Sequence, residues 1–98
     1  MLRHIVMWKF RPGTEAERDL FPTGLQGLYG AIPELKSCQV LRGMEGSDYD
    51  AVLISEFADQ AALEAYKNDP RHKAVSALCK SIRTDRAAVD CLLPDPEE

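Results

Sequence analysis

The stretch LRHIVMWKF, Leu2–Phe10, decides the fold of this 98-residue chain. It is rich in β-branched and aromatic residues, and Pro12 and Gly13 follow it, so it predicts a first β-strand. One face of that strand takes the even-numbered residues, which are Leu2, His4, Val6, Trp8 and Phe10. Ile5 and Met7 lie on the other face. Because both faces carry apolar groups, we expect this strand to lie in a sheet with both sides covered.

The stretch after this strand predicts an amphipathic helix. Apolar residues recur there at spacings of four, three and four, at Phe21, Leu25, Leu28 and Ile32. Thr14 and Glu17 fit a capping box, which places the helix start at Thr14. Pro22 is tolerated in a first turn, which would place the start near Phe21 instead. Pro33 is expected to end the helix.

The rest of the chain predicts three more strands and a second helical region. The strands are expected at residues 35–44, 51–57 and 87–93, with a polar turn at 43–50. Asp59 can cap a short helix that carries Leu63 and Tyr66. Asp69 followed by Pro70 then predicts a fresh helix start, with proline at the first helical position.

The order of these elements is β-α-β followed by β-α-β, which is typical of an α+β, ferredoxin-like fold. Such a βαββαβ protomer has a four-stranded antiparallel sheet with both helical regions on one face. We expect one domain over residues 1–93, because the chain is too short for two, and a flexible acidic tail over 94–98.

The sheet face without helices predicts a partner. Ile5, Met7, Val52 and Ile54, or their alternating neighbours, fall on that face. An apolar sheet surface of this kind is normally covered. A second copy packed sheet to sheet would cover it through an isologous interface, so we predict a homodimer through the open sheet face.

Composition excludes several classes of function. The net charge of −4 and the pI near 5.1 provide no basic stripe for nucleic acid. No apolar run approaches the roughly 20 residues of a membrane span, and no signal-peptide core follows Met1, so the expected location is cytoplasmic. Neither a phosphate loop nor a set of metal ligands occurs, and no cofactor is expected.

Three cysteines, Cys38, Cys79 and Cys91, are widely spaced and form no Cys-x-x-Cys pair. This argues against a disulfide framework and against a zinc site. Each is expected to be a small core residue, although a reactive thiol stays open as an alternative.

Candidate site residues are the two histidines, His4 and His72, together with Tyr66. His4 lies on the strand face of Val6 and Trp8, which are the expected ligand contacts. His72 lies near a helix N-terminus, whose partial positive charge favours the neutral imidazole that a general base requires. The structural alternative is that His4 is a hydrogen-bonded core residue and that His72 is an ordinary surface residue.

Five segments in order resemble the Dabb family of stress-responsive dimeric α/β-barrel proteins. They are His4 to Phe10, Ile32 to Leu35, Tyr49 to Phe57, Tyr66 to His72 and Val89 to Cys91. The resemblance implies a ferredoxin-like protomer that forms a dimeric α+β barrel. By similarity to a plant polyketide cyclase of this family, His72 would be a general base for a proton between two carbonyl groups. Tyr66 would orient that base or the substrate, and His4 would hydrogen-bond a substrate oxygen.

The resemblance implies a cofactor-independent lyase or cyclase that acts on a small carbonyl or polyketide-like molecule. The alternative is a non-catalytic stress protein that binds a small apolar ligand or assembles with itself. A third possibility is a relative of the cofactorless monooxygenases and haem-degrading proteins that share the barrel, for which Trp8 is the one hint. The first hypothesis requires a cavity between sheet and helices with His4 and His72 in it.

Overall fold

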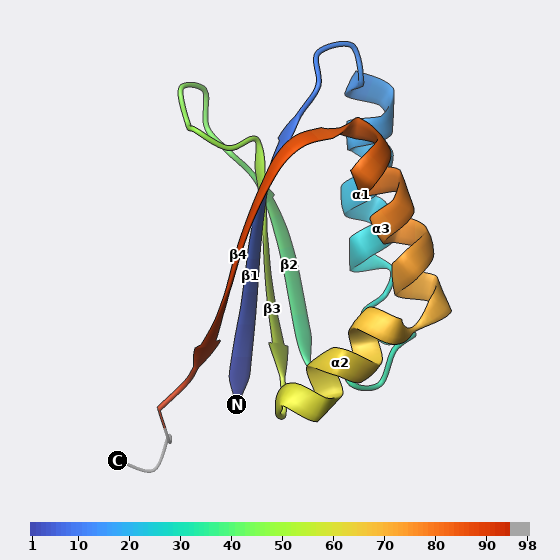
Figure 1. The fold of residues 1–98 in the computed structure, drawn as a ribbon, viewed down its shortest axis with the longest axis vertical. Coiled ribbons are helices and arrows are strands. Elements are labelled where there is room, and N and C mark those ends of the chain that lie inside the picture. The colour runs from blue at the N-terminus through green and yellow to red at the C-terminus, as the bar shows by residue number, and fades with distance from the viewer. Residues whose placement is uncertain (95–98) are drawn as a thin grey trace.

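The structure is a computed structural model that describes residues 1–94 (Figure 1). Its elements are β1 (Leu2–Phe10), α1 (Glu15–Gln26), β2 (Ser37–Arg42), β3 (Ala51–Phe57), α2 (Gln60–Asn68), α3 (Pro70–Ile82) and β4 (Arg83–Leu92). The predicted tail over 94–98 lies outside the described residues, apart from Pro94.

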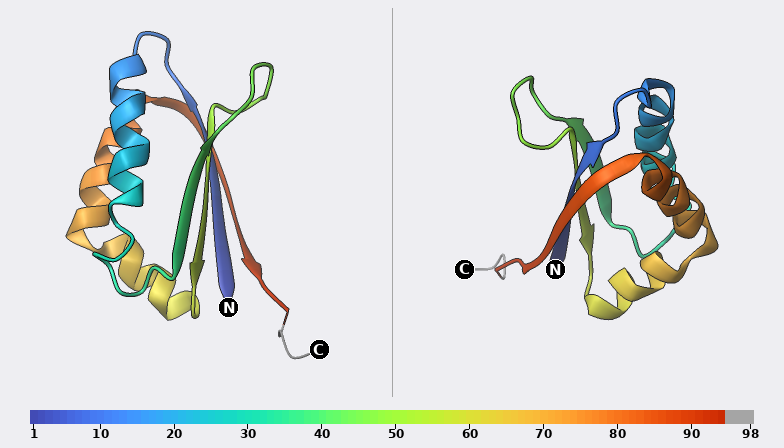
Figure 2. Two further views of the ribbon diagram at one scale, coloured as in Figure 1. Left: turned by 180° about the vertical axis from the view of Figure 1, so that it is seen from behind. Right: turned by 45° about the horizontal axis from the view of Figure 1, so that its top comes forward.

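The four strands form one antiparallel sheet in the order β2-β3-β1-β4. All three helices lie on the same face of this sheet, and no element within residues 1–94 covers the opposite face (Figures 1 and 2). This confirms the α+β, ferredoxin-like βαββαβ fold, in which α2 and α3 together form the second helical region. β1 lies between β3 and β4, so its side chains are at the centre of the sheet.

The start of α1 predicted at Thr14 is confirmed, but its end differs from the prediction. It begins at Glu15, directly after Thr14, but the Thr14 hydroxyl donates to the Arg11 carbonyl and makes no cap hydrogen bond. The predicted capping box is therefore wrong, because the Thr14 side chain does not accept a hydrogen bond from the first turn of the helix. Pro22 lies inside the helix, which ends at Gln26 rather than at Pro33. Residues 27–35 turn back towards the sheet instead, and this turn still buries Leu28 and Ile32.

The second helical region follows its prediction closely. The Asp59 carboxylate accepts a hydrogen bond from the backbone N–H of Ala62 and caps α2. The Asp69 carboxylate accepts from the backbone N–H of Arg71 and caps α3, with Pro70 in the first helical turn. Both predicted caps are confirmed.

Two strands, β2 and β4, differ from their predicted bounds. β2 is shorter than the predicted 35–44, and β4 begins at Arg83 rather than at Ala87. The first residues of β4 are polar, so they show no apolar alternation. Their strand conformation comes from pairing with β1, which extends to Phe10 opposite Arg83. Backbone hydrogen bonds, rather than side-chain burial, define this end of the strand.

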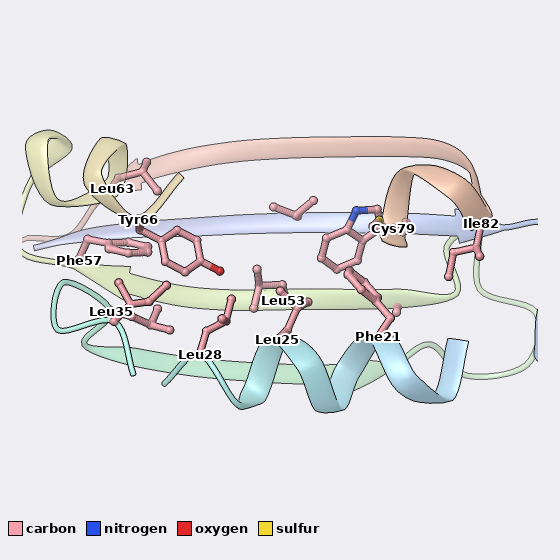
Figure 3. Close-up of a cluster of buried hydrophobic side chains, with 14 of the residues drawn as sticks. Phe21, Leu25, Leu28, Leu35, Leu53, Phe57, Leu63, Tyr66, Cys79 and Ile82 are labelled. Carbon is pink, nitrogen blue, oxygen red and sulfur yellow. The ribbon is translucent and has the colours of Figure 1, made fainter. Parts of the chain in front are cut away.

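The core lies between the sheet and the helices. Phe57 and Leu63 are fully buried there, and Tyr66 packs beside them (Figure 3). Ile32 is fully buried as well. The even-numbered residues of β1, including His4, all point into this layer and are buried. The predicted division of β1 into two faces is therefore confirmed.

The opposite side of the sheet, here called the open face, carries apolar residues that nothing in the described chain covers. Its members are Ile5, Met7, Leu41, Val52, Ile54 and Val89. In the sheet register Ile5 pairs with Ile54 on one side and with Val89 on the other, so these residues form one continuous row. Val89 remains 53% exposed.

Candidate functional site

A small cavity lies on the helix side of the sheet, between the β1 and β4 strands and α3. Its volume is about 60 Å³, which is space for a few water molecules or a small organic group. The apolar part of its wall is formed by Val6, Trp8, Phe21, Leu25 and Leu53. The remaining wall residues are His4, His72, Ser76, Cys79, Arg83 and Arg86. Both histidines that the sequence singled out therefore line one cavity.

His4 enters the cavity from the middle of β1 and is only 4% exposed. Its Nδ1 lies 2.5 Å from Oδ1 of Asp90, which is opposite His4 on the neighbouring strand β4. An ionised carboxylate can only accept, so the neutral imidazole carries its proton on Nδ1. Nε2 is then left with a lone pair, and Asp90 fixes both the tautomer and the orientation of the ring.

His72 enters from the first turns of α3 and is half-buried. Its Nδ1 lies 3.3 Å from the backbone carbonyl oxygen of Lys67 in α2. That oxygen also accepts only, so His72 carries its proton on Nδ1 when neutral and leaves a lone pair on Nε2. The two imidazoles thus have the same tautomer, each with an unprotonated Nε2.

Tyr66 packs behind His72 and does not line the cavity. The two ring centroids are 4.4 Å apart, and on its other side Tyr66 packs against Phe57 at 5.0 Å. Figure 3 shows the Tyr66 hydroxyl pointing into the layer between the sheet and α1. Among residues 1–94 this buried hydroxyl has no hydrogen-bond partner. In this geometry Tyr66 can position the His72 ring.

Both imidazoles are held neutral by their surroundings. Burial is the largest cause that lowers the pKa of His4, and the cations of Lys67 and Arg86 lower it further, while Asp90 raises it. Burial likewise lowers the pKa of His72, against the hydrogen bond to the Lys67 carbonyl, which raises it. A protonated His4 would also lower the pKa of His72, so the two imidazoles do not readily carry protons together.

Tyr66 stays protonated throughout the neutral range. Burial raises the pKa of its hydroxyl well above the usual value of 10.0. The hydroxyl is therefore a hydrogen-bond donor at neutral pH and never a base.

Trp8 and Val6, the predicted ligand contacts, form part of the apolar wall. The Trp8 ring meets Phe21 edge to face, with centroids 4.9 Å apart, and is 5% exposed. This contact fixes the indole by packing. Trp8 is thus both a core residue and a surface of the cavity.

The three cysteines differ in how deeply they are buried. Cys79 is buried in the cavity wall, where burial raises the pKa of its thiol, and Cys38 is partly buried with a pKa raised for the same reason. Cys91 is exposed on β4, so its prediction as a core residue is wrong. It lies beside Arg3 on the open face of an edge strand, which no other part of the described chain covers.

Metal clusters and membrane-spanning helices are both absent from residues 1–94. No group of three or more His, Cys, Asp or Glu side chains is placed there to hold a metal ion. None of the helices in this range reaches the length and apolarity that crossing a bilayer requires.

The sequence model of the family described as Stress responsive A/B Barrel Domain (Dabb) matches residues 2–92. This chain belongs to the Dabb family. The family resemblance drawn from the five short segments is thereby confirmed. No curated protein matches the chain.

Solved structures agree with the Dabb assignment. A dimeric ferredoxin-like protein of unknown function from Thermobifida fusca is 27% identical, with a TM-score of 0.84 over 94% of this chain and 90% of that chain. A Dabb family protein with a ferredoxin-like fold from Mesorhizobium loti is 25% identical, with a TM-score of 0.79 over 96% and 97%.

A hydroxynitrile lyase from Passiflora edulis superposes as well. Its TM-score is 0.84 over 96% of this chain and 94% of that chain, at 13% identity. At this identity the likeness shows the fold alone.

Sequence reasoning missed Asp90, Ser76 and the two arginines of this Dabb domain's cavity. Asp90 follows His4 by 86 residues, and only the register of β1 with β4 brings the two together. Arg83 and Arg86 lie in the polar part of β4 that was not predicted as a strand. A signal was present for Asp90, because it alternates with Val89 and Cys91 in the predicted fourth strand. Its position in that alternation could have placed the Asp90 side chain on the same face of the sheet as His4.

Proposed function

We propose that this Dabb domain is a cofactor-independent lyase or cyclase that acts on a small carbonyl compound. The observation that carries the proposal is that His4 and His72 line one cavity, each with Nδ1 bonded to an acceptor, which leaves the lone pair of the neutral ring on Nε2. Two neutral imidazoles whose lone pairs are available are suited to moving a proton between carbon and oxygen. Fold likeness alone supplies no such argument.

In the proposed reaction, Nε2 of His72 removes a proton from the carbon next to a carbonyl group. The electron pair of that C–H bond forms a new carbon–carbon bond to a second carbonyl carbon, whose π electrons move to its oxygen. The resulting alkoxide takes this same proton back from Nε2 of the His72 imidazolium, so one proton moves from carbon to oxygen and both histidines end neutral. Nε2 of His4 can carry the proton between these two steps, because the Asp90 carboxylate stabilises the positive charge on its ring. The lyase direction runs through the same steps in reverse.

Tyr66 contributes as a positioning residue in this proposal. Its ring holds His72 from behind, and its hydroxyl does not reach the cavity wall. A Tyr66→Phe change keeps the ring and removes only the hydroxyl, so it separates these two roles.

The size of the cavity favours a small substrate. About 60 Å³ is well below the roughly 300–1,000 Å³ of sites for drug-sized ligands. A compound with few heavy atoms fits this space, whereas a polyketide-sized chain would require α3 to move away from the sheet. We therefore favour a small carbonyl compound over a polyketide.

Hydrogen–deuterium exchange tests the proposal without knowledge of the natural substrate. Pyruvamide, a small neutral ketone, is incubated with the protein in D₂O, and the loss of its methyl signal is followed by proton NMR. We expect exchange in the wild type to exceed that in free imidazole at the same concentration. His72→Gln should slow it by about 100-fold, the order of a general base's contribution. Exchange no faster than with free imidazole would contradict the proposal.

Controls separate chemistry from folding. Lys36→Gln removes a charge at an exposed position that does not line the cavity and should leave the exchange rate unchanged. Thermal unfolding of each variant shows whether it is folded. If His72→Gln lowers the unfolding temperature and leaves exchange unaffected, the histidine is structural, and the non-catalytic alternative is favoured.

We also propose that the protein works as a homodimer through the open face. The continuous row formed by Ile5, Ile54 and Val89 supports this, because it is apolar and uncovered in the described chain. The dimeric state of the Thermobifida fusca neighbour supports it as well. The cavity lies on the opposite side of the sheet, so such a dimer would leave it accessible.

A further inference from the structure

The cavity is rimmed by positive charge, although the chain as a whole carries a net charge of −4. Arg83 and Arg86 project from β4 on the same side of the sheet as Trp8 and line the cavity. A second, shallow hollow adjoins it, because His72 and Ser76 line both. Three lysines surround that hollow: Lys67, Lys73 and Lys80.

The two arginines are not neutralised by nearby acids. Within residues 1–94, no carboxylate lies within ion-pair distance of Arg83 or Arg86. Asp90 is bonded to His4, and Asp69 forms an ion pair with Arg71 at 2.8 Å. Asp85 is opposite Lys9 in the sheet register and accepts a hydrogen bond from the backbone N–H of Arg86 rather than from its guanidinium group. The positive charge of β4 is thus available to a ligand.

The effect of this charge on the cavity wall is visible in its titratable groups. The guanidinium groups of Arg83 and Arg86 both act to lower the pKa of the Cys79 thiol, although burial raises it overall. Arg86 and Lys67 also act to lower the pKa of His4. A cation that disfavours imidazolium at His4 will favour an anion placed in the same space.

We propose that the cavity selects a small carbonyl compound that bears a carboxylate, with Arg86 and Arg83 binding the carboxylate and the two histidines facing the carbonyl end. This inference rests on the proposed function, since it names the substrate class for the same site. The apolar wall formed by Val6, Leu25 and Leu53 is suited to the uncharged part of such a molecule. A 2-oxo acid combines these features in few heavy atoms.

Carboxylate fits the site better than a larger anion does. A guanidinium group presents a planar fork of N–H donors that matches a carboxylate with two parallel hydrogen bonds. The cavity of about 60 Å³ leaves room for a planar carboxylate with a short chain. Inorganic phosphate shares the negative charge but has no carbonyl for the histidines, so it serves as the competing probe.

A matched pair of ligands tests the inference. Pyruvate and pyruvamide have the same number of heavy atoms, and only pyruvate is charged. Titration of each into the ¹⁵N-labelled full-length protein, followed by NMR, gives the two dissociation constants. We expect pyruvate to bind at least about tenfold more tightly, the order of one hydrogen bond to a charged group, and we expect high salt to reduce this preference.

Substitutions locate the charge that is responsible. Arg86→Gln should remove most of the preference for pyruvate, and Arg86→Lys should retain part of it. Arg86 is exposed on an edge strand, so the variant should fold, and thermal unfolding checks this. Lys36→Gln, the same loss of charge outside the site, should leave the preference intact.

The outcomes separate this inference from the proposed function. Equal affinities for pyruvate and pyruvamide, or tighter binding of phosphate than of pyruvate, overturn the carboxylate site, and exchange catalysed on pyruvamide would still support the base chemistry. A preference for pyruvate that depends on Arg86 supports the anion site even if no exchange occurs. In that case the base chemistry is what fails.

Discussion

Both faces of the sheet carry apolar residues, but only one face is packed against other elements within residues 1–94. On β3, Leu53 and Phe57 point to the helices and are 2% and 0% exposed. Val52 and Ile54 alternate with them on the open face and stay partly exposed. A period of two along the strand therefore shows which residues share a face. It does not show whether the partner of that face comes from the same chain.

The covered face also differs from the open face in its polar content. The buried polar side chains among the described residues are His4 and Ser55, and both lie on the helix side. Burying a polar group costs free energy unless it is hydrogen-bonded, and His4 meets this requirement through Asp90. A titratable group placed in the packed face is typical of function rather than of stability.

The largest expected effect is on the covered face. Phe57→Ala removes a fully buried ring that packs against Tyr66, so it should lower the free energy of unfolding by about 3–5 kcal/mol. Ile54→Ala on the open face should cost less, and its cost should grow with protein concentration if a dimer covers it. Urea unfolding at several concentrations measures both. Equal losses at every concentration would contradict the difference between the faces.

A charge on the open face should act on assembly rather than on folding. Ile54→Glu places a carboxylate next to Ile5 in the centre of the apolar row. Burying that charge in a sheet-to-sheet interface should weaken the dimer by about 100-fold or more. Sedimentation velocity at several concentrations measures this. Ala61→Glu adds the same residue on the exposed side of α2 and should leave the dimer unchanged.

A result of the opposite kind would be equally informative. If Ile54→Glu stays dimeric with an unchanged dissociation constant, the interface lies elsewhere on the protomer. The apolar row would then need another explanation.

Most of the fold was predictable because it depends on local patterns. The alternation of Leu2–Phe10, the Asp59 cap and the Asp69–Pro70 helix start each act within a few residues. The start of β4 was not predictable in this way, since Arg83 and its polar neighbours are strand residues only through pairing with β1. At these positions, pairing with a neighbouring strand overrides the weak intrinsic β-propensity of the residues.

The candidate site was predictable in its residues but not in its arrangement. His4 and His72 could be named as candidates because histidine is a common general base, but only the fold shows that both line one cavity. Tyr66 was expected near the same space and packs behind His72 instead. The Asp90 partner depends on strand register across most of the chain, which one sequence does not specify.

The smallest expected effect is a pH dependence that comes from the covered face. The folded state holds the pKa values of His4 and His72 below the usual 6.5, mainly through burial. As the pH falls through 6.5, the unfolded chain therefore takes up protons before the folded protein does. Stability should be full above this pH, should decline as the pH falls towards the folded-state pKa values, and should then level off.

The measurement is the unfolding temperature between neutral and mildly acidic pH, compared with that of His4→Leu. Leucine removes the titrating group from the packed face, so the decline in this variant should be shallower. Ile54→Ala leaves both histidines in place and should keep the wild-type slope. If stability instead rose as the pH fell, the folded-state pKa values would lie above 6.5, and Asp90 rather than burial would dominate at His4. The covered face would then hold a charged imidazolium at His4, whose Nε2 could not take up the proton that His72 removes.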